Sequence, residues 1–96
     1  MLRTALLALA FVSAPALATS SHYLAQPVAA PTKETVVTRD AVWKCAGGAC
    51  AAPRGNSRAE VACQALVREV GALASFSANG TAFAAEQLDK CNARAR

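Results

Sequence analysis

The sequence predicts a small, disulfide-stapled α+β domain with the order β-hairpin, helix, short β-hairpin, helix. Three observations lead to this prediction. Residues 34–44 are rich in β-branched side chains and run into a Gly-Gly pair, which is typical of a strand and its turn. Residues 58–71 and 84–95 place apolar side chains at helical spacing. Four cysteines follow an N-terminal segment typical of exported proteins, in which disulfides persist.

The first 18 residues have the three zones of a cleavable signal peptide. Arg3 supplies a positive charge, residues 5–12 are an apolar run, and Ala16 and Ala18 are the small residues that signal peptidase requires. We expect cleavage after Ala18. The apolar run is too short for a membrane anchor, because crossing the hydrocarbon core takes about 20 residues. We therefore expect export to the periplasm or the medium, with no transmembrane anchor left after cleavage.

Residues 19–32 contain no Asp, Glu, Lys or Arg, include two prolines and show no sustained periodicity. We interpret this segment as a flexible tether that precedes the folded domain at 33–96. His22, the only histidine, lies in it. A general base must be held within hydrogen-bond reach of the proton it takes, so we expect no catalytic role for His22.

The first hairpin is expected to hold one disulfide. Residues 34–44 are predicted as one strand, and Gly47 and Gly48 as the turn. In that register Cys45 faces Cys50 at a non-hydrogen-bonded position, where opposed Cα atoms lie about 4.5 Å apart and a disulfide fits. Alternation places Trp43 on the same face as Cys45, so its ring can lie beside the bridge.

Ser57 and Glu60 fit a capping box that begins the helix over 58–71. One face of this helix is predicted to be buried and consists of Cys63, Leu66, Val67 and Val70. Glu60, Gln64 and Arg68 line the opposite, solvated face.

A second hairpin is predicted from the alternation over 73–78 and the Asn79-Gly80 turn signal, with Phe83 across from Phe76. The last helix, 84–95, has Ala84, Leu88, Cys91 and Ala95 on its inner face. With Cys45 and Cys50 paired, the remaining pair is Cys63–Cys91, across the contact between the two helices. On the loop-entropy account, the longer loop stabilises by roughly 3.5 kcal/mol and the short one by roughly 2.

The chain carries 10 Lys and Arg against 6 Asp and Glu, a net charge of +4. That balance favours anionic surfaces slightly. It falls short of the dense basic surface of nucleic-acid-binding proteins, so we expect no nucleic-acid partner.

A metal site is the first alternative for the four cysteines. Their spacing is C-x4-C, then 12 and 27 intervening residues. Structural zinc sites favour tighter C-x2-C pairs. We therefore expect disulfides, no metal and no other cofactor.

Thiol–disulfide chemistry is the second alternative. Redox enzymes usually place Cys-x-x-Cys at a helix start, whereas Cys45 and Cys50 lie in a predicted hairpin. A labile, regulatory Cys45–Cys50 bridge stays open as an alternative. The chain has no G-x-S-x-G, P-loop or dinucleotide-binding motif, and we assign no catalytic residue.

A contact surface is predicted around the first hairpin. Trp43 near the surface would anchor a partner, although packing on a disulfide is the commoner arrangement. Lys44, Arg54 and Arg58 lie near the hairpin end and the helix start, where a helix N-terminus and cations can hold an anion. The alternative is a scattered, solvated set of charges.

The chain resembles an uncharacterised family of short exported bacterial proteins over about residues 40–95. The residues that carry this resemblance are Trp43-x-Cys45, Cys50, Ser57-Arg58, Cys63-x-x-Leu66, Gly71, Phe76, Gly80, Leu88 and Cys91-Asn92. The resemblance implies a small, exported, four-cysteine protein and assigns no activity.

The expected function is a non-enzymatic binding or structural module. Its partner is unknown, and we expect an envelope protein or an anionic component of the cell envelope. One alternative is a small redox factor or other enzyme that uses Cys45 and Cys50. Another is an inhibitor of an envelope or extracellular enzyme.

Overall fold

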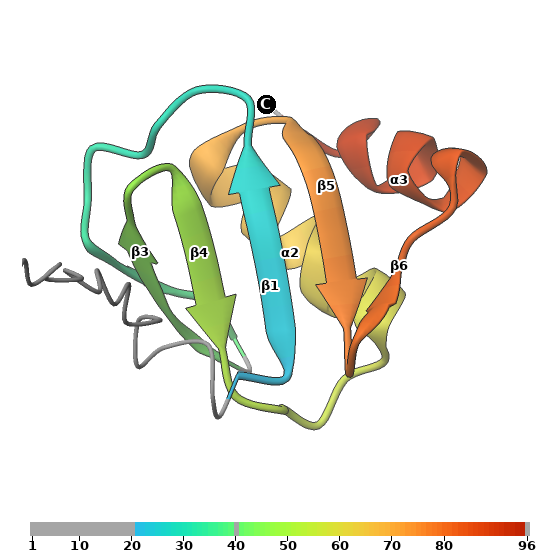
Figure 1. The fold of residues 1–96 in the computed structure, drawn as a ribbon, viewed down its shortest axis with the longest axis horizontal. Coiled ribbons are helices and arrows are strands. Elements are labelled where there is room, and N and C mark those ends of the chain that lie inside the picture. Colours follow the sequence, from blue (N-terminus) through green and yellow to red (C-terminus); the bar gives the residue numbers. More distant parts are fainter. Residues whose placement is uncertain (1–20, 40, 96) are drawn as a thin grey trace, which may run out of the picture.

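One antiparallel sheet and two helices make up the fold of the computed structural model, which describes residues 21–39 and 41–95. The strands are β1 (Tyr23–Pro27), β2 (Thr35–Val37), β3 (Val42–Ala46), β4 (Ala49–Ala52), β5 (Leu73–Ala78) and β6 (Thr81–Ala82), and the helices are α2 (Ala59–Val70) and α3 (Ala85–Asn92). The strand order is β2-β3-β4-β1-β5-β6. Figure 1 shows α2 crossing one face of the sheet, with α3 at the β5–β6 end. The predicted α+β class is confirmed. The expected signal peptide lies outside the described residues.

β1 occupies the centre of the sheet, so the interpretation of 19–32 as a flexible tether is wrong for Tyr23–Pro27. The strand pairs with β4 on one side and β5 on the other, with Ala25 opposite both Cys50 and Phe76. Its side chains alternate between buried and exposed. The pattern escaped prediction because the strand has only five residues, and two of its three inward positions hold alanine and proline. Pro27 sits at a bulge, one of the few places where a sheet accepts proline.

Residues 34–44 form two strands instead of the single predicted one. β2 and β3 pair with Val36 opposite Trp43, and the chain reverses between them. Thr38 holds the reversal, because its N–H and its hydroxyl both donate to the carbonyl of Ala41, at 2.9 and 3.2 Å. β-branched composition marks strands but does not mark where a strand ends, and this turn contains no glycine or proline.

Both predicted turns are confirmed. Gly47 and Gly48 have φ of 60° and 82°, the positive values that a type I′ turn needs at both central positions. Asn79 and Gly80 show the same pair of positive values, 52° and 81°. The turn at 79–80 brings Phe83 back to Phe76, and the N–H of Phe83 donates to the carbonyl of Phe76 at 2.8 Å.

The helices lie where predicted, but their N-termini differ from the prediction. α2 begins one residue later, with Arg58 as its N-cap and no side-chain cap, so the predicted capping box of Ser57 and Glu60 is wrong. The carbonyl of Ser57 instead accepts a hydrogen bond from the Tyr23 hydroxyl at 3.2 Å. α3 is shorter than predicted, and the Ala84 N–H donates to Gln87 Oε1 at its start. The buried face of α2 is Ala62, Cys63, Leu66 and Val67.

Replacing Tyr23 with alanine tests whether β1 is part of the core. Tyr23 is 2% exposed and packs against Trp43 and Phe76. We expect Tyr23→Ala to lower the free energy of unfolding by about 3–5 kcal/mol, the usual effect of removing a buried aromatic ring. The measurement is urea unfolding of the oxidised chain. Leu24→Ala is the matched control, because Leu24 faces solvent on the same strand. Equal, small effects of both substitutions would contradict a central β1.

Candidate interaction surface

Both disulfides join the cysteines that the sequence predicted. Cys45–Cys50 links β3 to β4 with the Cα atoms 4.0 Å apart, and Cys63–Cys91 links α2 to α3 with the Cα atoms 5.9 Å apart. None of the four residues is more than 6% exposed. A thiolate can attack a disulfide only if it reaches a sulfur. Both bridges are therefore shielded from exchange while the domain stays closed.

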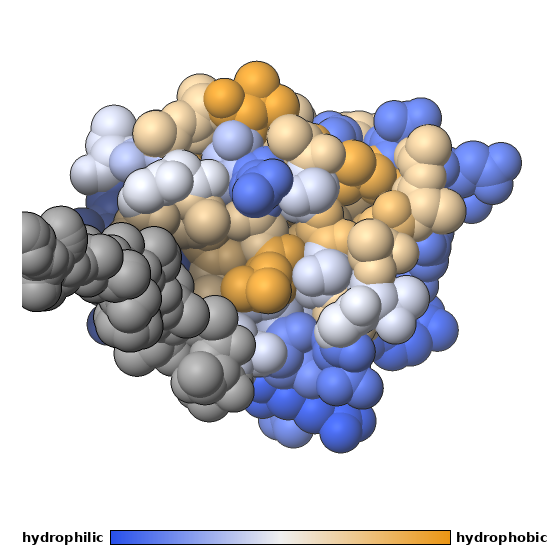
Figure 2. Space-filling model, in the orientation of Figure 1, coloured by the Kyte–Doolittle hydropathy of each residue, from blue (hydrophilic) through white to orange (hydrophobic). Residues whose placement is uncertain are grey.

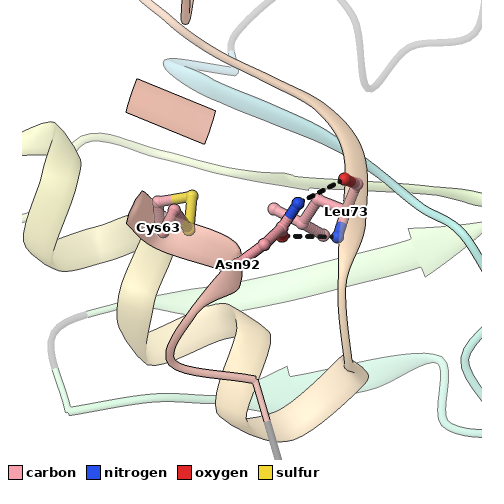
Figure 3. The surroundings of a disulfide bond; sticks show 4 residues. Cys63, Leu73 and Asn92 are labelled. Carbon is pink, nitrogen blue, oxygen red and sulfur yellow. Dashed lines mark hydrogen bonds between the residues drawn. A yellow bond between two sulfur atoms is a disulfide. The ribbon is translucent and has the colours of Figure 1, made fainter. Parts of the chain in front are cut away.

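Asn92 fixes the end of α3 to the start of β5. Its amide group donates to the Leu73 carbonyl at 3.0 Å and accepts from the Leu73 N–H at 2.8 Å. The side chain thus pairs with the backbone as a neighbouring strand would. Figure 3 shows this pair of hydrogen bonds next to the bridge at Cys63. Sequence reasoning noted Asn92 only as part of a family pattern, because the partner backbone lies 19 residues away.

Trp43 is fully buried, so its predicted place in a contact surface is wrong. Its ring centroid lies 5.7 Å from that of Tyr23 and 6.2 Å from that of Phe76, and its Nε1 donates to Thr38 Oγ1 at 3.3 Å. The physical reason is the alternation along β3, which turns Trp43 and Cys45 toward the helix side of the sheet.

Lys44, Arg54 and Arg58 are all exposed, as predicted, but they lie on three different elements. Lys44 is on the outer face of β3, where its Nζ donates to Thr35 Oγ1 at 3.4 Å. Arg54 lies in the loop after β4, and Arg58 is the N-cap of α2. A shared anion site of these three side chains therefore stays a prediction.

The outer face of the sheet carries exposed apolar side chains. Leu24 on β1 and Val42 on β3 are 41% and 46% exposed, and Val37 on β2 is 66% exposed. Figure 2 shows tan and orange residues over the strands of this face, and blue residues along its lower and right-hand rims. The sequence reasoning placed no surface here because it gave residues 19–32 no part in the sheet.

A groove of about 420 Å³ runs between α2 and the β2–β3 turn. Its lining residues are Val37, Thr38, Arg39, Val61, Gln64, Ala65, Arg68 and Glu69. Arg39 and Arg68 face this groove from the turn and from the helix. Sequence reasoning missed it, since a continuous strand over 34–44 contains no turn that could approach the helix.

The remaining candidates for chemistry lie apart from one another. The backbone of His22 is held in place, because its backbone N–H donates to the Ala52 carbonyl and its backbone carbonyl accepts from the Asn79 N–H. Its ring meets Tyr23 edge-on. Within residues 21–39 and 41–95, no polar or charged residue is buried, and no three His, Cys, Asp or Glu side chains gather in a possible metal site.

In the same part of the chain, no helix has the length and apolar character needed to cross a membrane.

Removing the two bridges separately should show which one matters more for stability. The bridges span sequence separations of 28 and 5. We expect Cys63→Ser with Cys91→Ser to cost roughly 3.5 kcal/mol of unfolding free energy, and Cys45→Ser with Cys50→Ser roughly 2, because the longer loop restricts the unfolded chain more. Urea unfolding of the two double variants measures both. The reverse order would contradict the loop-entropy account.

Replacing Asn92 with aspartate should weaken the link between α3 and β5. A carboxylate accepts from the Leu73 N–H but cannot donate to the Leu73 carbonyl. We expect a loss of about 1–3 kcal/mol in thermal or urea unfolding at neutral pH, the cost of an unsatisfied, part-buried acceptor. The loss should shrink toward pH of about 4, where a protonated carboxyl donates again. Asn56→Asp, in an exposed loop, is the control. A pH-independent loss would argue against the two-bond geometry.

Comparison with known proteins gives one match. A family model described as a family of unknown function, DUF8200, matches residues 6–93. No curated protein and no solved structure matches the chain.

Proposed function

The chain belongs to DUF8200, a family of unknown function, and from that premise we propose that it is an exported bacterial protein that acts as a non-enzymatic binding module. The observation that carries this proposal is the burial of both disulfides in a domain whose polar and charged residues, as far as they are described, stay at the surface. Such bridges persist in oxidising compartments. The signal-like residues 1–18 agree with that location.

The position of β1 is compatible with removal of a leader. Cleavage after Ala18 leaves residues 19–22 ahead of Tyr23, the first residue of β1. The sheet therefore keeps all its strands in the mature chain. The match of the family model from residue 6 onward also includes most of the expected signal peptide.

Two alternatives differ in how well the geometry supports them. A redox factor would need an accessible sulfur at Cys45 or Cys50, and both residues are buried, with their side chains on the inner face of the sheet. An inhibitor of an extracellular or envelope enzyme would be a binding module whose partner is that enzyme. The exposed apolar face of the sheet and the groove beside α2 are the surfaces that a partner would use.

Export is tested by expressing the full chain with a C-terminal tag in a bacterium and measuring the intact mass of the envelope fraction. We expect a chain that begins at Thr19 and has no free thiol. Ala18→Arg should accumulate uncleaved, because signal peptidase needs a small residue there, and Ser20→Ala should be processed normally. A full-length cytoplasmic chain with four free thiols would contradict export.

The non-enzymatic part is tested on the same mature protein with an insulin-reduction assay for thiol–disulfide exchange. We expect no catalysed exchange from the wild type or from the Cys45→Ser, Cys50→Ser double variant. Catalysed exchange that disappears in a folded double variant would favour the redox alternative.

A further inference from the structure

β2 lies at the edge of the sheet, and the backbone groups of two of its three residues face away from β3. The Cys45 N–H donates to the Glu34 carbonyl at 2.8 Å, and the Thr38 N–H donates to the Ala41 carbonyl at 2.9 Å. Hydrogen-bonded positions alternate along an antiparallel pair, so the N–H and C=O groups of Thr35 and Val37 point outward. Such groups form a template on which another strand can pair.

A hollow lies at each end of this edge strand. The groove of about 420 Å³ between the β2–β3 turn and α2 is lined in part by Val37. A second hollow of about 660 Å³, at the other end of β2, is lined in part by Thr35. Thr35 and Val37 are two residues apart, so their side chains point to the same face of the sheet. The groove lies at the Val37 end of β2 and the second hollow at its Thr35 end, so a strand added along β2 would extend from one to the other.

Among the residues that the structure describes, each hollow has more basic than acidic side chains. Arg39 and Arg68 line the groove beside α2, together with one acid, Glu69. This surplus of positive charge favours an acidic side chain on the added strand.

The second hollow repeats this balance. Lys33 and Lys44 line it together with one acid, Glu34. The added strand would thus meet cations at both ends of β2.

We propose that β2 binds an extended, acidic peptide segment of a partner protein as a seventh strand of the sheet. Backbone hydrogen bonds to Thr35 and Val37 supply the affinity, and acidic side chains opposite Arg39 and Arg68 supply the selectivity. This inference rests on the proposed binding function and names its partner class. It also gives the exposed Val37 side chain a role, since an added strand would cover part of it.

The test selects short random peptides from a display library on the oxidised mature chain and measures their affinity by fluorescence anisotropy. We expect the selected peptides to be rich in Asp, Glu and β-branched residues and poor in proline. Val37→Pro removes an outward N–H that β3 does not use, and we expect it to weaken binding by about tenfold or more. The double variant Arg39→Glu, Arg68→Glu should weaken acidic peptides similarly.

Two variants serve as matched controls. Ala82→Pro removes the corresponding outward N–H on the opposite edge strand β6, since the neighbouring 76–83 pair is hydrogen-bonded. Lys90→Glu reverses a charge on the exposed side of α3. Both should leave the affinity within about twofold of wild type. A thermal melt of each variant confirms folding, and if Val37→Pro does not fold, the arginine double variant decides.

Several results would overturn the inference. If the selected peptides bind Val37→Pro as tightly as the wild type, their binding site lies on another surface, and the proposed binding function still holds. If the library yields no enriched peptide, a peptide partner is contradicted. If the chain dimerises and Val37→Pro abolishes the dimer, the β2 edge pairs with a second copy of the chain instead. Binding to phosphatidylglycerol vesicles that depends on Arg39 and Arg68, but not on Val37, would assign the cations to a lipid surface. A failure of the separate export test would instead contradict the exported location in the proposed function.

Discussion

The insertion of β1 between β4 and β5 is the constraint on which the rest of the structure depends. Without β1, strands β2, β3 and β4 would be separated from β5 and β6 and joined to them only through α2. β1 bonds to both parts and places Tyr23 between Trp43 and Phe76. β1 needs partners that extend to residue 78, so the sheet cannot close until those residues are available.

The disulfides add covalent links to the sheet that β1 joins. α3 has eight residues, and Cys91 is the one that is fully buried, so packing alone holds this helix weakly. The Cys63–Cys91 bridge and the Asn92 hydrogen bonds tie it to α2 and to β5. Because the sulfur atoms and the tryptophan face inward, the surfaces available for binding a partner are the outer face of the sheet, the groove beside α2 and the β2 edge.

Features encoded within a short stretch of sequence could be predicted, and features that depend on distant partners could not. The Gly47-Gly48 turn fixes which cysteines face each other, and this local register settled both disulfides. β1 has few large apolar residues, and its partners lie far along the chain, so its composition resembled that of a linker. The same limit applies to Asn92, whose partner is a backbone segment 19 residues away. For the contact surface, Trp43 was misplaced because the side of the sheet that α2 would cover could not be read from β3 alone.

Residue-resolved amide hydrogen exchange of the oxidised mature chain tests the central place of β1 most directly. We expect the N–H groups of Leu24, Ala25 and Gln26 to exchange with an opening free energy within about 1 kcal/mol of that of Leu66 in α2, because β1 can open only when the whole domain unfolds. Exchange of the β1 amides at an opening free energy near zero, with Leu66 still protected, would contradict it.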